Sequence, residues 1–178
     1  MEISEYQRII AAYQGANQVA KLLASRQLRV VYAESCTGGL VAGCLSHVSG
    51  ISNWLCGSSV VYQEQTKVSW LGIDATCIDK FTSTSREMSE AIARQVLTST
   101  GQADFALGVT GHLETNASPQ GAYVWCVICS RVELHERVCP SSFYPLKEST
   151  RIGRQWAAVE FAHKFTLDWL SEQELSCS

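Results

Sequence analysis

The residues with the clearest chemical potential lie in the run Tyr32–Leu40, which reads YAESCTGGL. Ser35 and Thr37 carry hydroxyl groups, and Gly38 and Gly39 follow directly. A strand is expected to end before this turn and a helix to begin after it, so both hydroxyls project at the carboxyl end of a strand. Backbone N–H groups at a helix start favour an anion or a developing oxyanion. A Ser or Thr cap followed by a tight glycine turn has the same sequence pattern, so the alternative stays open.

A second pair of candidate residues follows at Tyr62 and Lys67, in the run VVYQEQTK. Tyr62 ends an expected strand, and Lys67 lies about one helical turn further on. A lysine buried beside Ser35 would lose its proton more readily and could then act as the base for a serine. The alternative is a core tyrosine with a solvated lysine, and the spacing alone does not separate the two.

The chain has eight cysteines, but their spacing does not predict a metal site. Cys126 and Cys129 have C-x-x-C spacing within an apolar run that is typical of a buried strand. Positions i and i+3 of a strand face opposite sides of a sheet, so one metal ion cannot easily take both. No second C-x-x-C pair completes a zinc site. We therefore expect no metal, and most cysteines should be small buried hydrophobic residues in a reducing compartment.

Length and composition restrict the class of protein. The 178 residues suit one domain over 1–178, and 46% hydrophobic against 17% charged residues argues against a disordered chain. Lys and Arg number 14 and Asp and Glu 17, so the formal net charge of −3 argues against a nucleic-acid binder. No apolar run approaches the roughly 18 residues of a membrane helix, and no signal sequence is visible. We therefore expect a cytoplasmic protein without a membrane partner.

The elements that must position these residues alternate between helix and strand. Helices are expected at 3–27, 40–47, 63–71, 84–99 and 149–170, and strands at 29–34, 58–62, 104–110, 121–130 and 132–138. The helix at 84–99 should begin with a capping pattern from Thr84 to Glu87. This order predicts a three-layer α/β/α sandwich with a mixed, mostly parallel sheet of about five to six strands. Ligands of such sheets usually bind at the carboxyl ends of the strands.

Four segments in this order resemble the CinA C-terminal domain family: AESCTGG, SGIS-W, VVY-x4-K-x3-LG and FALGVTG. The similarity covers about residues 5–170. It implies an amidohydrolase of NAD salvage, in the pyridine nucleotide cycle, that converts nicotinamide mononucleotide to nicotinic acid mononucleotide and ammonia. It implies the same α/β/α sandwich and no metal or cofactor. As partners it implies a small-molecule nucleotide substrate and further copies of the chain in a homo-oligomer, a dimer.

The resemblance also implies roles for individual residues. Ser35 matches the nucleophile, and Tyr62 and Lys67 match the pair that activates it and handles the proton. The implied substrate-binding residues are Thr37, Gly38, Gly39, Thr110, Gly111 and Arg154.

The chain departs from the family pattern after the third expected strand. Residues 111–121 read GHLETNASPQG, where the family carries a Gly-Pro-Gly-Gly-rich loop. Glycines allow close backbone approach to a ligand, and the carboxylate of Glu114 would repel an anionic phosphate. His112 is either a new catalytic group or polar surface. Arg154 fits a basic residue expected near the start of the last helix, and Arg151 falls one position off the family pattern. Each of the two either meets a substrate phosphate or is solvated.

Three functions remain open from these residues. The first is an amidase acting on nicotinamide mononucleotide, which the intact set of Ser35, Tyr62 and Lys67 favours. The second is an amidase whose altered loop has shifted the substrate. The third is a catalytically silent module that binds a nucleotide or another protein, which the remodelled loop at 111–121 would favour.

Overall fold

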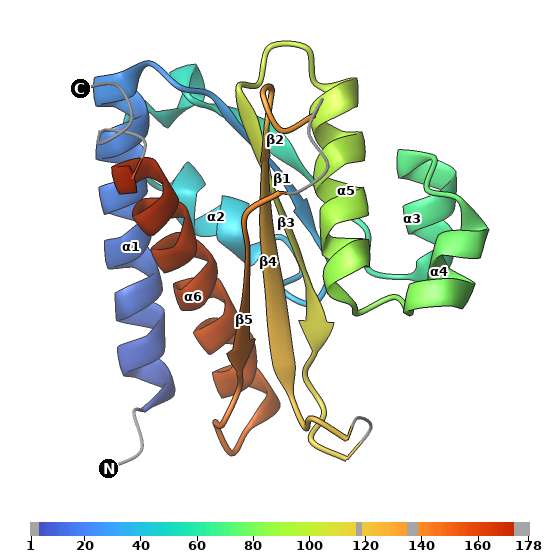
Figure 1. Cartoon of the computed structure of the whole chain (residues 1–178). Helices are drawn as coiled ribbons and strands as arrows, with labels where there is room; N and C mark the ends of the chain where they lie inside the picture. Colours follow the sequence, from blue (N-terminus) through green and yellow to red (C-terminus); the bar gives the residue numbers. More distant parts are fainter. Residues whose placement is uncertain (1–3, 117–118, 135–138, 173–178) are drawn as a thin grey trace.

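The protein is described by a computed structural model that covers residues 4–116, 119–134 and 139–172. A central sheet is covered by helices on both faces, and Figure 1 shows these three layers. The helices are α1 (Glu5–Arg26), α2 (Leu40–Ser46), α3 (Glu64–Leu71), α4 (Ala75–Phe81), α5 (Arg86–Ser99) and α6 (Arg151–Glu172), with a short 3-10 turn at Ile51–Asn53. The strands are β1 (Val30–Glu34), β2 (Leu55–Val60), β3 (Phe105–His112), β4 (Tyr123–Ser130) and β5 (Ser141–Pro145).

The sheet is mixed and has the strand order β2-β1-β3-β4-β5. β1 is parallel to both β2 and β3, while β4 is antiparallel to both β3 and β5. Helices connect the parallel strands, as parallel pairing requires. The predicted three-layer α/β/α sandwich with a mixed sheet is therefore confirmed. β1 lies between β2 and β3, so the residues that follow it stand at the carboxyl edge of three parallel strands.

Two hydrophobic clusters fill the spaces between the layers. One joins α1, α2 and α6 to one face of the sheet, and the other joins α5 to the opposite face. Cys126 belongs to the first cluster and Cys129 to the second, so the predicted opposite orientation of the C-x-x-C pair is confirmed. Among the described residues, no group of three or more His, Cys, Asp and Glu side chains could hold a metal ion. No helix in the described ranges is long and apolar enough to span a membrane.

The prediction of a strand at 132–138 is wrong for residues 132–134, the part that the structure describes. Residues 131–134 form a turn, and 135–138 lie outside the described residues. The Ser130 hydroxyl accepts hydrogen bonds from the N–H groups of Val132 and Glu133, and the Glu133 carboxylate accepts one from Ser130 N–H. Such local side-chain bonds compete with a strand ladder. The partner of β4 is therefore β5, further along the chain.

Two helix starts also differ from the sequence prediction. The N-cap of α5 is Ser85, whose hydroxyl accepts from Met88 N–H, while the Thr84 hydroxyl bonds to the Tyr123 hydroxyl at 3.0 Å. Helix α4 was not predicted. The signal was an Asp74 cap, whose carboxylate accepts from Thr76 N–H at 2.9 Å.

Helices α1 and α6 pack closely around a buried histidine. A Cβ atom at Gly15 would lie 2.9 Å from the Cβ of His163, so the close approach requires glycine. His163 is completely buried, and neither ring nitrogen has a hydrogen-bond partner among the described residues. Burial disfavours the charged imidazolium and lowers the pKa of His163 from 6.5 to about 4.

We predict that replacing His163 by Leu weakens the loss of stability in acid. In the wild type, the unfolded chain takes up a proton at His163 as pH falls below its ordinary pKa, but the folded chain does so only near its lowered pKa. As the pH is lowered from about 6.5 to about 4, His163 should therefore decrease the free energy of unfolding of the wild type by about 3 kcal/mol. Above about pH 6.5 it should have no such effect on stability. Urea unfolding of both proteins across this range measures the difference. An identical pH dependence would contradict the prediction.

Candidate active site

The turn between β1 and α2 is built around the carboxylate of Glu34, the last residue of β1. Glu34 is completely buried. Its two oxygens accept hydrogen bonds from Thr37 Oγ1 at 2.8 Å, Gly39 N at 3.0 Å, Val41 N at 3.1 Å, Ala42 N at 3.0 Å and Ser58 Oγ at 3.1 Å. A carboxylate at a helix N-terminus also interacts favourably with the helix dipole. These bonds hold the turn that carries Ser35.

The turn with Gly38 and Gly39 directs hydrogen-bond donors at the Glu34 carboxylate. Thr37 is completely buried, and Gly38 N donates to the backbone oxygen of Ser35 at 3.0 Å. Gly38 and Gly39 have φ angles of +65° and +93°, in the left-handed region that favours glycine. Thr37, Gly38 and Gly39 therefore shape the turn, and none of them is among the residues that line the cavity at Ser35. The first amides of α2 bond to Glu34 in place of a substrate oxyanion.

A cavity of about 240 Å³ opens at the carboxyl end of β1. Residues from distant parts of the chain line it, including Ser35, Tyr62, Lys67, Gly111, Glu114 and Arg151. The structure thus brings together the predicted nucleophile, both members of the predicted activating pair and one predicted glycine. Thr110 and Arg154 do not line this cavity.

The central contact in the cavity joins Lys67 Nζ to Ser35 Oγ at 3.2 Å. Lys67 is 1% exposed, and Nζ also contacts the backbone oxygens of Val61 at 3.0 Å and Tyr62 at 3.5 Å. All three of these partners are neutral. Burial therefore lowers the pKa of Lys67, a shift that the negative charge of Glu64 opposes only in part.

This environment suits a neutral amine. An uncharged lysine has two N–H donors and one lone pair. The backbone oxygens of Val61 and Tyr62 can accept both N–H groups, which leaves the lone pair to accept the proton of the Ser35 hydroxyl. The geometry is that of a nucleophile within hydrogen-bond reach of its base.

The Tyr62 hydroxyl points to a different partner. It accepts a hydrogen bond from Arg151 Nη2 at 2.8 Å, and the Tyr62 side chain is 52% exposed. Arg151 also forms an ion pair with Glu114. In the described structure the hydroxyl makes no hydrogen bond with Ser35 or Lys67, so only the backbone of Tyr62 contacts the lysine amine.

The other predicted substrate residues have partners within the protein. Arg154 is buried, and its guanidinium donates to the backbone oxygens of Leu113 at 2.6 Å and Glu148 at 2.8 Å. Arg154 thus joins the loop after β3 to the start of α6. The Thr110 hydroxyl donates to the backbone oxygen of Ser83 at 3.0 Å.

Gly111 lines the cavity, but the neighbouring strand β4, not the cavity, excludes a side chain at this position. A Cβ at Gly111 would lie 2.2 Å from the backbone oxygen of Tyr123, across the β3–β4 ladder.

Several residues of the site were missed or left undecided by the sequence analysis, including His112, which lines the cavity. Glu34 was missed, although an acidic residue inside a β-branched strand that ends at a helix start is a usable signal. Arg151 was left undecided, and the structure places it at the cavity. Cys36 stands beside Ser35, but burial, reinforced by the charge of Glu34, raises the pKa of its thiol to about 12, so it is a poor nucleophile.

Comparison with known proteins gives one family. Residues 12–166 match the model described as the CinA C-terminal domain. A CinA-like protein of Flavobacterium psychrophilum is 38% identical over 109 residues, which cover 61% of this chain and 26% of that protein. A relative from Alkaliphilus oremlandii with the name competence-damage inducible protein is 30% identical over 164 residues. The match covers 90% of this chain and 37% of the relative. The chain thus spans well under half the length of these curated relatives.

A solved structure shows the same fold. The crystal structure of a CinA superfamily protein from Klebsiella pneumoniae matches with a TM-score of 0.81 and 21% sequence identity. The match covers 90% of this chain and 98% of the other.

We predict that Glu34→Gln destabilises the protein by about 2–3 kcal/mol despite its similar shape, because an amide nitrogen cannot accept hydrogen bonds from buried N–H groups. The free energy of unfolding, measured in urea, checks this. Ser58→Ala removes a single bond to the same carboxylate and should cost only about 1 kcal/mol. Equal stabilities of the two variants would contradict the role given to Glu34.

Proposed function

The chain belongs to the CinA C-terminal domain family, and we propose that it is a serine amidohydrolase that converts nicotinamide mononucleotide to nicotinic acid mononucleotide and ammonia. One observation carries this proposal. Ser35 Oγ lies 3.2 Å from the amine of Lys67, which is buried among neutral partners. This arrangement supports a reactive serine, and a silent binding module would not need it.

The proposed reaction uses the lysine as both base and acid. Neutral Lys67 takes the proton of Ser35 while Oγ attacks the carboxamide carbon of the substrate. The C–N bond of the tetrahedral adduct then breaks, Lys67 gives the proton to the departing ammonia, and the acyl group stays on Ser35 Oγ as an ester. A water molecule next gives a proton to Lys67 and attacks the ester carbon. The bond from this carbon to Oγ then breaks, Lys67 passes the proton to Oγ to restore the Ser35 hydroxyl, and the carboxylic acid product leaves as its carboxylate.

We assign contact with the substrate's phosphate to Arg151. Arg151 lines the cavity and is half exposed, whereas Arg154 is buried, its guanidinium donates to backbone oxygens, and its Nη2 lies 3.9 Å from Glu114 Oε2. The Tyr62 hydroxyl lies 2.8 Å from Arg151 Nη2, so we place it beside the same substrate group. Its place beside Arg151 supports binding of substrate over a direct proton transfer with Ser35.

A second candidate is an amidase for an uncharged amide. The observation that favours it is the ion pair between Glu114 and Arg151, because the carboxylate already neutralises the cation that would meet a phosphate. In that case the loop at 111–121 selects against anionic substrates. Activity on small neutral amides, with none on the mononucleotide, would distinguish this candidate.

We predict that Ser35→Ala lowers ammonia release from nicotinamide mononucleotide about 10⁴-fold or more, because the nucleophile is removed. Lys67→Met should have a similar effect. In the wild type the rate should rise with pH and level off once Lys67 is deprotonated, at a pKa below the ordinary lysine value. A coupled ammonia assay measures the rates. Ser46→Ala, on the exposed side of α2, is the matched control, and retained turnover in Ser35→Ala would contradict the mechanism.

We predict that Glu114→Gln lowers KM for the mononucleotide by up to about fivefold, because exposed ion pairs are worth about 0.2–1 kcal/mol and the substrate's phosphate no longer has to displace a carboxylate. Steady-state kinetics measure this change. Glu172→Gln, at the end of α6 that lies furthest from Arg151, is the control for the change in net charge. If KM rises or stays the same in Glu114→Gln, Glu114 does not compete with the substrate for Arg151.

A further inference from the structure

A groove of about 1050 Å³ adjoins the cavity at Ser35. Ser83, Thr84 and His112 line both hollows, so the two hollows adjoin each other at these residues. The cavity of about 240 Å³ that holds the proposed catalytic residues is much the smaller of the two. A bound molecule can therefore extend from Ser35 past His112 into the groove.

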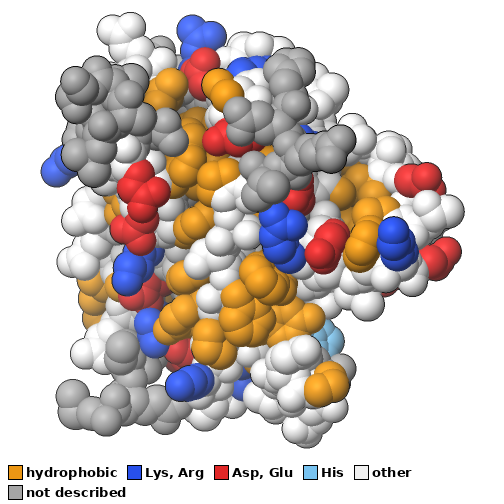
Figure 2. All heavy atoms as spheres, viewed as in Figure 1, with side chains coloured by type: hydrophobic (Ala, Val, Ile, Leu, Met, Phe, Trp, Pro, Cys, Tyr) orange, Lys and Arg blue, Asp and Glu red, His pale blue; other side chains and the backbone are white. Residues whose placement is uncertain are grey.

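The floor of this groove is aromatic. Tyr123 and Trp125 alternate along β4 with buried Val124, and Trp125 pairs in register with Phe143 of β5. The ring centroids of Phe143 and Trp125 are 5.0 Å apart, and those of Phe143 and Tyr123 are 5.5 Å apart. Figure 2 shows hydrophobic side chains gathered over β4 and β5 on this face of the molecule. We refer to Tyr123, Trp125 and Phe143 as the aromatic floor.

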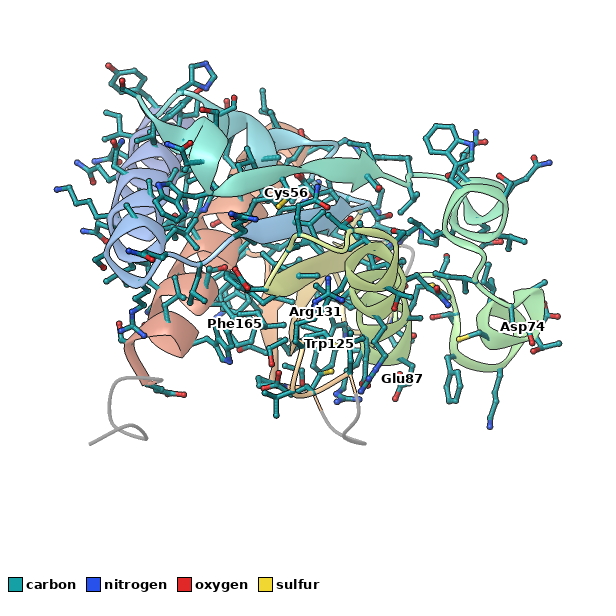
Figure 3. All side chains as sticks on the ribbon, turned by 90° about the horizontal axis from the view of Figure 1, so that it is seen from above. Cys56, Asp74, Glu87, Trp125, Arg131 and Phe165 are labelled. Carbon is teal, nitrogen blue, oxygen red and sulfur yellow. The ribbon has the colours of Figure 1, made fainter. Side chains whose placement is uncertain are left out.

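The groove is uncovered because helix α5 begins beside it. Further along β4, Val127 and Cys129 are buried in the cluster that α5 covers. At Trp125 the wall is formed by the first turn of α5, where Glu87 lies, and Figure 3 shows these two residues on the same side of the sheet. Phe143 is consequently 39% exposed. Trp125 is partly exposed and Tyr123 is buried, so the three rings line the wall of a hollow. A concave hollow lined by aromatic side chains is typical of a ligand site.

The floor is also held in place. The Tyr123 hydroxyl bonds to the Thr84 hydroxyl at 3.0 Å, which ties β4 to the segment before α5. Where the groove meets the cavity, His112 Nε2 is buried and has no hydrogen-bond partner among the described residues. Buried polar atoms are nearly always hydrogen-bonded, so a polar group of a molecule that crosses this junction would supply the missing partner.

We propose that the aromatic floor binds a second planar ring of the substrate, of the nucleobase type, joined to the part that carries the reactive carboxamide. This inference rests on the proposed amidase function. Stacking of a base on an aromatic side chain contributes about 1–3 kcal/mol. The groove adjoins the cavity at Ser35, which favours a single extended substrate over a protein partner as its occupant. The preferred substrate is then a dinucleotide amide, since a mononucleotide has no second ring for the floor.

The test compares two substrates with the same carboxamide, nicotinamide mononucleotide and nicotinamide adenine dinucleotide. Wild-type kcat/KM should be higher for the dinucleotide. Trp125→Ala should lower the ratio of the two kcat/KM values about tenfold, and Trp125→Phe should restore most of it, because phenylalanine keeps a stacking surface. Trp70→Ala, which alters an exposed tryptophan of α3 outside the groove, should leave the ratio unchanged. A ratio that does not change in Trp125→Ala would overturn the proposal.

A binding measurement separates this inference from the catalytic one. If neither substrate releases ammonia, the proposed function fails, and calorimetric titration with adenosine monophosphate tests the groove alone. Binding to the wild type that weakens at least fivefold in Trp125→Ala supports a ring-binding groove, and an absence of binding overturns it. Analytical ultracentrifugation of the wild type and Trp125→Ala measures whether the groove is instead an interface between copies of the chain. If Trp125→Ala dissociates an oligomer and leaves the substrate ratio unchanged, the groove is an interface between copies of the chain, and the proposal is wrong.

Discussion

The carboxylate of Glu34 is the interaction on which the candidate site depends. It accepts hydrogen bonds from the turn, from the first amides of α2 and from Ser58 of β2. The next residue, Ser35, donates its backbone N–H to the backbone oxygen of Val109 on β3 at 2.9 Å. One buried charge thus holds β1, β2 and α2 together, and the backbone of Ser35 adds β3. Because a buried carboxylate is stable only when its oxygens are satisfied, the turn has little freedom to move.

Glu34 and Lys67, both buried at the site, have separate hydrogen-bond partners. Glu34 is satisfied by N–H and O–H donors of the turn and of β2, while Lys67 contacts the Ser35 hydroxyl and two backbone oxygens. An ion pair between them would stabilise the charged lysine and make it a poor base. The hydrogen bonds to Glu34 therefore have a chemical consequence for Lys67. Among the described residues Lys67 forms no ion pair with Glu34, so burial lowers its pKa, a shift that the charge of Glu64 opposes only in part.

The two ends of the cavity differ in character. At one end, Tyr62, Arg151 and Glu114 form an exposed polar cluster, in which the carboxylate comes from the loop that departs from the family pattern. At the other end, at His112, the cavity adjoins the groove that contains the aromatic floor. A substrate with an anionic group and more than one ring would match both ends. Our proposals for Glu114 and for the aromatic floor thus concern the same elongated binding site.

Local sequence patterns determined most elements of this fold, because hydrophobic periodicity, glycine turns and helix caps act over a few neighbouring residues. They left the roles of Ser35 and Lys67 open, and only the resemblance to the family assigned them, while the approach of the two side chains follows once β1 and β2 are parallel neighbours. The tertiary structure alone decided which partner each polar side chain meets. In the folded chain the backbone amides of the turn donate to Glu34. Arg151 lies at the cavity, whereas Arg154 bonds to backbone oxygens. β4 pairs with β5 at 141–145. A hydrogen bond is made or lost within about an ångström, and such distances depend on strand register and helix packing that no local pattern contains.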